Sequence, residues 1–207
     1  MVKQKGFTLV ELILAMAFFS FILLFVIVGF VQINRSYTRG ITTKEVQNTA
    51  RELMENISLA IRNSEANSIE TFNTVPGRLR LCAGTTRFGW NMADAGGNFT
   101  SEVYGDTGGI ISISRTSTGA CQDPIALNAS GGNGTQSLVP DNIVVQYLEV
   151  RRLGTSNSYT VELVISTDGR ANPLDFSTFG PNATCDIQTG DQFCDVARLE
   201  TVVTARN

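Results

Sequence analysis

The sequence contains no histidine, and it contains no lysine after Lys44. The first absence excludes the Ser-His-Asp and Cys-His arrangements that activate a nucleophile, so proton transfer near neutral pH falls to a tuned carboxylate or lysine. The second removes every candidate for Schiff-base chemistry from the later part of the chain. Acids such as Asp191 and Asp195 remain, but we interpret them as solvated turn residues. We therefore expect a protein that is not an enzyme.

Metal-binding patterns are also missing. No Cys-x-x-Cys pair occurs, and a zinc site built from cysteines alone would need such closely spaced ligands. Asp186, Asp191 and Asp195 could offer oxygen atoms to calcium, but their spacing does not match an EF-hand loop. We predict no metal ion and no cofactor.

What the sequence does have is a long apolar run near its N-terminus. From Phe7 to Val31 the only charged residue is Glu11. As a helix this run spans roughly 37 Å, which exceeds the roughly 30 Å hydrocarbon core of a bilayer. A secretory signal would have a shorter apolar region followed by a small-residue cleavage site. We predict a transmembrane helix over residues 7–31.

Glu11 is the unusual residue within this run. A carboxylate in the first turns of a membrane helix requires a positively charged partner, and the same helix offers none within reach toward the membrane interior. The partner is therefore expected from another chain. The alternative is a plain membrane anchor, in which the Glu11 side chain reaches back to the lipid headgroups and Gly6 has no special role.

The segment from Lys5 to Leu12, KGFTLVEL, resembles the class III signal of bacterial type IV prepilins and type II secretion pseudopilins. The family pattern is a short basic leader, cleavage after a glycine, an aromatic first mature residue and a glutamate four positions later. The resemblance implies that residues 1–6 are a leader, that prepilin peptidase cleaves between Gly6 and Phe7, and that Phe7 is then N-methylated. It also implies that Glu11 pairs with the N-terminal amine of a neighbouring subunit. Burying both charges is tolerable only if they meet.

The same resemblance indicates where the protein resides and what it contacts. Its expected partners are prepilin peptidase, other pilin or pseudopilin subunits, the inner-membrane assembly platform and, before assembly, the lipid bilayer. Basic residues flank the run on both sides, so the positive-inside rule decides little. The leader chemistry places the N-terminus inside the bacterial cytoplasmic membrane, and four cysteines after residue 80 suit an oxidising exterior. We expect a single-pass membrane protein that enters an extracellular or periplasmic filament.

Beyond the membrane run the apolar pattern becomes one-sided. Apolar residues recur at intervals of three and four, which predicts an amphipathic helix that continues to about Asn63; they are Val46, Ala50, Leu53, Met54, Ile57, Ala60 and Ile61. We expect a long helix over residues 7–63 with its outer half packed on the protein's own core. Gly40 suggests a hinge, and Thr42 to Glu45 has the form of a capping box that would restart the helix.

Residues 64–207 are expected to form one exterior β-rich domain. Strand patterns occur at residues 78–82, 109–115, 142–153, 158–167 and 196–205. The segments 142–153 and 158–167 are separated by the four residues from Gly154 to Asn157, a spacing that predicts a hairpin. The predicted fold is α+β and pilin-like, with one antiparallel sheet packed on the outer half of the long helix.

The cysteines of the exterior domain are Cys82, Cys121, Cys185 and Cys194. Four cysteines allow three pairings, and the sequence alone does not choose among them. Loop length favours Cys185 with Cys194, which leaves Cys82 with Cys121. Type IV pilins and their relatives often close a C-terminal loop with a disulfide, so the resemblance points to the same pairing.

Charge gives no support for nucleic-acid binding. Removal of the leader lysines would lower the formal net charge from −3 to −5, which is opposite to the basic footprint of a nucleic-acid-binding protein. The one local basic and aromatic cluster contains Arg78, Arg80, Arg87, Phe88 and Trp90. We interpret it as a strand and a turn with a core tryptophan.

The exterior domain is larger than that of most major pilins. The chain most resembles a minor pilin of the W type or a J-type pseudopilin, which implies a place in a priming or tip complex. Two alternatives stay open: a membrane-anchored binding module that does not polymerise, and a DNA-uptake (competence) pilin.

Overall fold

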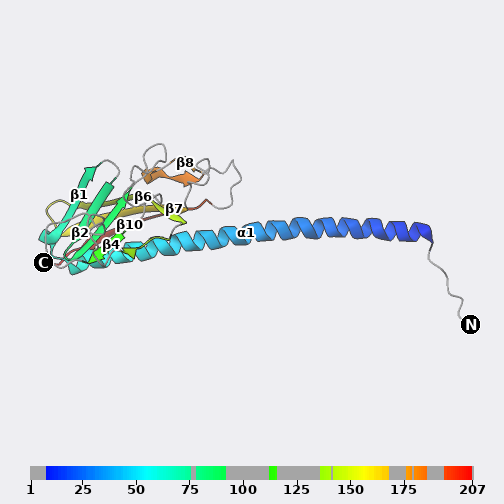
Figure 1. Cartoon of the computed structure of the whole chain (residues 1–207), viewed down its shortest axis with the longest axis horizontal. Helices are drawn as coiled ribbons and strands as arrows, with labels where there is room; N and C mark the ends of the chain where they lie inside the picture. The colour runs from blue at the N-terminus through cyan, green and yellow to red at the C-terminus, as the bar shows by residue number, and fades with distance from the viewer. Residues whose placement is uncertain are drawn as a thin grey trace, which may run out of the picture. The chain divides into compact units, whose positions relative to one another are not determined.

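The computed structural model describes residues 8–75, 78–91, 112–115, 136–140, 142–167, 176–178, 180–185 and 194–206. They form one long helix, α1 (Leu9–Asn63), followed by antiparallel β-sheets, and Figure 1 shows both. The expected α+β, pilin-like arrangement is therefore confirmed. The chain divides into two compact units, Met1–Ile41 and Thr42–Asn207, so that the last part of α1 belongs to the same unit as the strands.

The predicted restart of the helix is wrong. α1 continues through Gly40, Thr42 and Glu45 without a break. A single glycine costs only about 1 kcal/mol in a helix interior, and a helix that is already formed gains a hydrogen bond for each residue it adds. The Thr42–Glu45 pair therefore lies within a helix that has no need of a new N-terminus.

The strands fall into separate sheets rather than the single sheet that we expected. A five-stranded sheet has the order β1-β2-β3-β4-β5, and a three-stranded sheet has the order β10-β7-β6. The first contains β1 (Ile69–Val75), β2 (Arg78–Ala83), β3 (Thr86–Asn91), β4 (Ser112–Arg115) and β5 (Gln136–Ser137). The second contains β6 (Ile143–Arg152), β7 (Ser158–Thr167) and β10 (Val196–Thr204). Alternation along a strand predicts which face is buried but not which strand is its neighbour.

Four shorter elements complete the described fold. β8 (Phe176–Thr178) pairs with β9 (Thr184–Cys185), and two single turns of 3₁₀ helix lie at Ala66–Ser68 and Gly180–Asn182. Every pairing between the named strands is antiparallel.

The predicted hairpin is present between β6 and β7. Arg152 lies opposite Tyr159 at its closed end. The Leu153 N–H donates to the Ser158 carbonyl at 2.9 Å, and Gly154 takes a φ of +59° that favours glycine over any residue with a Cβ. β7 is the central strand of its sheet and is buried along most of its length.

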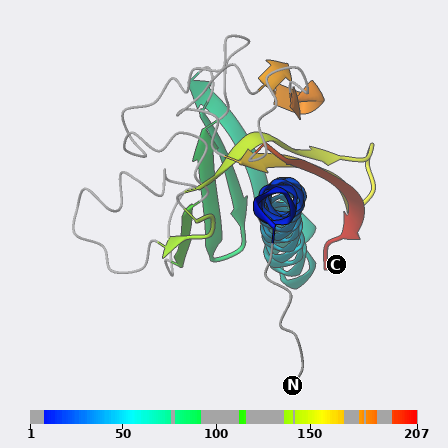
Figure 2. The same cartoon turned by 90° about the vertical axis from the view of Figure 1, so that its right-hand side faces the viewer.

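The hydrophobic core lies between the outer part of α1 and both large sheets. Leu53, Ile57 and Ile61 of the helix are fully buried, as are Phe88 of β3 and Leu163 of β7. Figure 2, which looks along α1, shows β10 on one side of the helix and the green strands of the five-stranded sheet on the other. The predicted apolar stripe is therefore the surface that joins helix and sheets, with Ala60 at its partly buried margin.

The residues after α1 tie the end of the helix to the last strand. The Arg206 N–H donates to the Ser64 carbonyl at 2.9 Å, and the Ala66 N–H donates to the Arg206 carbonyl at 3.2 Å. The hydroxyl of Tyr159, which is buried, donates to the Ala66 carbonyl at 3.0 Å. These bonds satisfy backbone groups at the turn that leads from the helix into β1.

We expect Leu53→Ala to destabilise the full-length protein by about 2–5 kcal/mol, because truncation of a fully buried leucine leaves a cavity. Leu59→Ala is the matched control, since Leu59 lies on the same helix and is 46% exposed. Denaturant unfolding in detergent, followed by the fluorescence of buried Trp90, measures both. Equal losses for the two variants would contradict the assignment of the core face.

Candidate functional site

The helix α1 begins with a reciprocal pair of hydrogen bonds between Thr8 and Glu11. The Thr8 backbone N–H and the Thr8 hydroxyl both donate to Glu11 Oε2, each at 2.9 Å. The Glu11 N–H in turn lies 3.3 Å from Thr8 Oγ1. This arrangement is a capping box, in which a threonine before the first turn and a glutamate three residues later satisfy each other's backbone donors.

The capping box gives Glu11 a role inside its own chain. A helix N-terminus has backbone N–H groups with no partner in the helix, and a carboxylate placed there is stabilised by them. All three hydrogen bonds involve Oε2 or the backbone, so Glu11 Oε1 has no hydrogen bond within the described residues. One carboxylate oxygen holds the helix end while the other can accept a cation.

Thr8 is the functional residue that our sequence reading missed. The signal was available, because Thr8-x-x-Glu11 has the same form as the Thr42-x-x-Glu45 pair that we interpreted as a capping box. The pattern carries that meaning only where a helix begins, and α1 begins at the first pair and not at the second. Gly6 and Phe7, the predicted cleavage and methylation residues, lie outside the described residues.

The first part of α1 has no cover within its own unit. α1 contains a stretch of mean hydropathy 2.9 that is long and apolar enough to cross a membrane, and none of that stretch is buried. Even its largest side chains are exposed to solvent; for example, Phe18, Phe25 and Phe30 are 65%, 79% and 70% exposed. This is not the surface of a helix in the core of a water-soluble protein.

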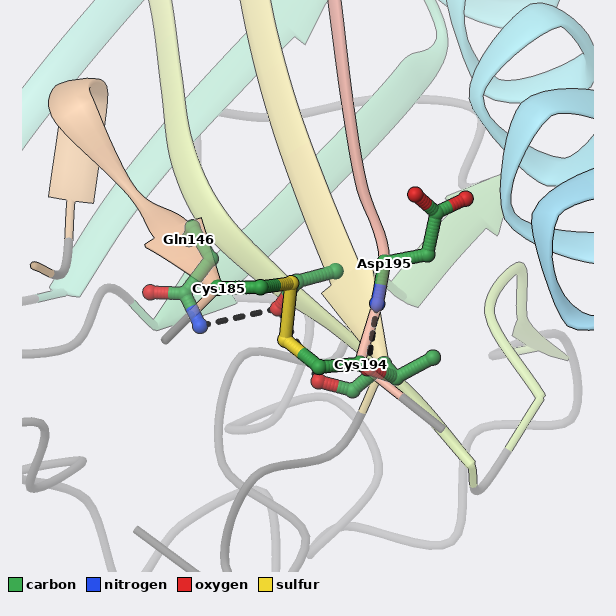
Figure 3. The surroundings of a disulfide bond; sticks show 6 residues. Gln146, Cys185, Cys194 and Asp195 are labelled. Carbon is green, nitrogen blue, oxygen red and sulfur yellow. Dashed lines mark hydrogen bonds between the residues drawn. A yellow bond between two sulfur atoms is a disulfide. The ribbon is translucent and has the colours of Figure 1, made fainter. Parts of the chain in front are cut away.

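A disulfide joins Cys185, at the end of β9, to Cys194, just before β10. This is the pairing that loop length favoured. Figure 3 shows it beside Gln146 of β6 and Asp195. Gln146 Nε2 donates to the buried Ser166 hydroxyl at 2.9 Å, and the Asp195 N–H donates to Thr167 Oγ1 at 3.2 Å. Cys82 is also disulfide-bonded, but Cys121, its predicted partner, lies outside the described residues.

The face of the three-stranded sheet that points away from α1 carries a row of three glutamates. Glu162 of β7 lies directly opposite Glu149 of β6 and Glu200 of β10. We call Glu149, Glu162 and Glu200 the glutamate row. Like charges in directly opposite positions destabilise a sheet. Glu162 and Glu200 make no hydrogen bond or ion pair among the described residues. Arg151, two residues after Glu149 in β6, and Arg198, two residues before Glu200 in β10, lie on the same face of the sheet.

Tyr147 lies beside this row and donates its hydroxyl to Glu149 Oε2 at 3.0 Å. Burial, the hydrogen bond to Glu149 and the negative charges of Glu149 and Glu162 together raise the pKa of Tyr147 to about 12. All of these causes favour the neutral phenol over the phenolate.

The basic and aromatic residues that are close in the sequence around β3 do not form a nucleic-acid-binding surface. Phe88 and Trp90 are 0% and 1% exposed and belong to the core, which confirms the interpretation of Trp90 as a core residue. Arg87 alternates with them along β3 and therefore lies on the opposite face of the strand. Buried rings cannot stack on nucleic-acid bases.

The described residues show no metal centre. They contain no group of three or more acids, cysteines or histidines that could hold an ion. Of the aspartates considered above for calcium, Asp186 and Asp191 lie outside the described residues.

Comparison with known proteins gives a match for the N-terminal segment. Residues 1–27 match the family model described as the prokaryotic N-terminal methylation motif. No curated protein and no solved structure matches the chain. This match supports the predicted class III signal, and with it a membrane-anchored type IV pilin or pseudopilin that prepilin peptidase processes and that assembles with other pilins.

We expect Thr8→Val to loosen the start of α1, because valine keeps the shape of threonine but removes the hydroxyl that bonds Glu11. The Glu11 amide should exchange with solvent about fivefold faster in detergent micelles, as for the loss of a typical N-cap. Thr8→Ser, which keeps the hydroxyl, should restore the slow exchange. Unchanged exchange in Thr8→Val would show that the capping box does not hold the helix end.

Alkaline titration tests the environment of Tyr147. A raised folded-state pKa means that Tyr147 contributes stability fully below about pH 10 and loses that contribution as the pH rises through about 12. The difference between wild type and Tyr147→Phe in phenolate absorbance should therefore appear near pH 12. Glu149→Gln should move this transition to lower pH, and a wild-type transition near pH 10 would contradict the assigned contacts.

Proposed function

We propose that this chain is a minor pilin or pseudopilin subunit that polymerises through α1 and is not an enzyme. Prepilin peptidase cleaves between Gly6 and Phe7, and Phe7 becomes the methylated first residue of the mature subunit. The observation that supports this most is Glu11, an acid held at the start of an otherwise apolar helix directly after the methylation motif.

The membrane orientation follows from the same chemistry. We place the N-terminus on the cytoplasmic side, where the peptidase acts, and the Thr42–Asn207 unit outside the cytoplasmic membrane. The disulfide between Cys185 and Cys194 supports an oxidising exterior for this unit. Before assembly the lipid bilayer covers the exposed apolar part of α1.

Assembly replaces lipid by neighbouring helices. The Phe7 amine of one subunit meets Glu11 Oε1 of the next, while Glu11 Oε2 remains bonded to Thr8. The pairing neutralises two charges in an apolar environment, where either one alone is costly. It therefore selects the axial register of the subunits, because other registers leave both charges without partners.

The proposal also assigns this chain to the minor subunits of the filament and not to the major subunit. In the Thr42–Asn207 unit the described residues combine three sheets with the outer part of α1. The chain most resembles W-type minor pilins and J-type pseudopilins, which act in priming or tip complexes. An anchored binding module that does not polymerise is the competing function. It would retain Lys3 and Lys5, because an uncleaved leader cannot provide the free amine of Phe7.

We expect Glu11→Ala to insert into the membrane and to be cleaved normally, but to enter filaments more than roughly tenfold less than wild type, because the amine of the neighbour then has no carboxylate. Glu52→Ala is the matched control, since Glu52 is an exposed acid further along α1. Membrane and sheared-filament fractions measure incorporation. Normal filament levels of Glu11→Ala would rule out the assembly role.

The mass of the N-terminal peptide separates the two functions. A filament subunit yields a peptide that begins at methylated Phe7, whereas an anchored module yields one that contains the intact leader.

A further inference from the structure

The stretch of α1 directly after the predicted membrane run carries two arginines on one face. Arg35 and Arg39 are four residues apart, so their side chains emerge next to each other on the helix surface. Both are exposed, and neither makes a hydrogen bond or an ion pair with another described residue. They belong to the Met1–Ile41 unit, which also contains the apolar run. We call Arg35 and Arg39 the arginine pair.

The helix gives the arginine pair no counter-ion close by. Glu11 is the only acid in residues 1–41, and the next acid in the sequence is Glu45. Glu45 follows Arg39 by six residues, whereas side chains on a helix meet at spacings of three and four. Two like charges at a spacing of four destabilise a helix. An anion held between the two guanidinium groups removes that cost.

The apolar run sets the depth at which the arginine pair lies in a membrane. Arg35 is roughly 36 Å beyond Glu11 along the helix, at a rise of about 1.5 Å per residue. The hydrocarbon core of a bilayer is roughly 30 Å thick, and the headgroup layer adds about 5–7 Å on each side. A helix tilt of about 20° shortens the distance by only about 2 Å. With Glu11 at one boundary of the core, Arg35 therefore lies in the opposite headgroup layer, and Arg39 lies one turn further out.

The direction of α1 favours a return of both side chains toward the membrane. The Cα–Cβ bonds of an α-helix tilt toward its N-terminus, and the apolar run is on the N-terminal side of the arginine pair. Arginine also lays its aliphatic stem along apolar surface while its charged end stays in the polar layer. The guanidinium groups of both residues can therefore reach the depth of the lipid phosphates.

A second face of the same stretch has the composition of a membrane interface. Ile33, Tyr37 and Ile41 recur at intervals of four and are offset by two positions from the arginine pair, so they lie on a different face of the helix. Ile33 and Tyr37 are 70% and 68% exposed. Tyrosine is enriched at the headgroup level, where its ring meets apolar surroundings and its hydroxyl meets polar ones. A basic face combined with an apolar face at this depth is suited to contact with anionic lipid.

We propose that the arginine pair binds the phosphate of an anionic phospholipid headgroup. A guanidinium group presents its donors in a planar fork that matches phosphate oxygens, and two such side chains with Cβ atoms about 5–6 Å apart can share one phosphate. In the proposed orientation the lipid belongs to the outer leaflet of the cytoplasmic membrane. The choice of leaflet rests on the proposed function, whereas the site itself requires only that the apolar run is inserted in a bilayer.

This site holds the mature subunit at a fixed depth. Cleavage after Gly6 removes Lys3 and Lys5, so the arginine pair then provides the basic residues next to the apolar run. Arginines on the exterior flank run against the positive-inside rule. Departures from a locally favourable choice occur mainly at functional positions.

The side-chain Nε–Hε signals of the arginines test the site. The ¹⁵N-labelled full-length protein is placed in phosphatidylcholine bicelles, and phosphatidylglycerol, which is anionic, replaces part of that lipid stepwise. We expect the signals of Arg35 and Arg39 to shift together and to saturate. Arg35→Gln should raise the phosphatidylglycerol fraction at half-saturation of the Arg39 signal roughly fivefold, since one basic residue at a membrane surface contributes about that factor. Inorganic phosphate added to phosphatidylcholine bicelles should not reproduce the shifts.

Arg51→Gln is the matched control. Arg51 is an exposed arginine of α1 in the Thr42–Asn207 unit, and it also makes no hydrogen bond or ion pair among the described residues. This variant should leave the half-saturation of the Arg39 signal unchanged, and the Arg51 signal of wild type should not move. An equal shift of all three arginines would reduce the effect to general surface charge and would overturn the site.

Failure of the site and failure of the proposed function are distinguishable. If the Arg35 and Arg39 signals ignore phosphatidylglycerol, or respond equally to inorganic phosphate, the lipid site is wrong, and filaments that contain wild type leave the proposed function standing. If Arg35→Gln with Arg39→Gln keeps a wild-type lipid response of the bicelle complex but enters filaments less, the pair contacts another subunit and the lipid site is wrong. If the signals respond as expected but the native chain keeps its leader and enters no filament, the site stands and the proposed function is wrong.

Discussion

The apolar surface of α1 is the constraint on which the rest of the structure depends. A helix of 55 residues carries such surface along its length, but the described residues supply a partner only for its outer part, where Leu53, Ile57 and Ile61 are buried against two sheets. The inner part is exposed and too hydrophobic to face water. Lipid or equivalent helices of other subunits must cover it. The division of one helix into a packed part and an open part is therefore the structural basis of a subunit that is stable alone yet able to assemble.

The features that depend on local patterns could be predicted from the sequence. The apolar stripe of α1, the hairpin around Gly154 and the strand β10 follow from periodicity and turn chemistry, which act over a few residues. The division into separate sheets could not, because strand partners are chosen by packing on α1. β1 and β3 were not among the predicted strands. Thr8 was missed for another reason: its capping role depends on where the helix begins, and an apolar run does not mark that residue.

The polar features of the Thr42–Asn207 unit are harder to explain by folding alone. A glutamate row across three strands places like charges directly opposite one another, which costs stability. Natural sequences depart from locally favourable choices mainly at functional sites.

The start of α1 shows how Glu11 is held within its own chain before the proposed pairing in the filament. If Glu11 had no partner before assembly, its carboxylate would have to leave the apolar segment, and the helix would begin later in the sequence. The bonds from Thr8 keep the carboxylate at the first turn, where the backbone N–H groups also favour negative charge. In the proposed pairing, an incoming amine needs no prior rupture of the helix end, because the bonds from Thr8 use only one carboxylate oxygen. The cost of ordering Glu11 would then be met before the neighbour arrives, so that the proposed pairing could discriminate between correct and shifted registers.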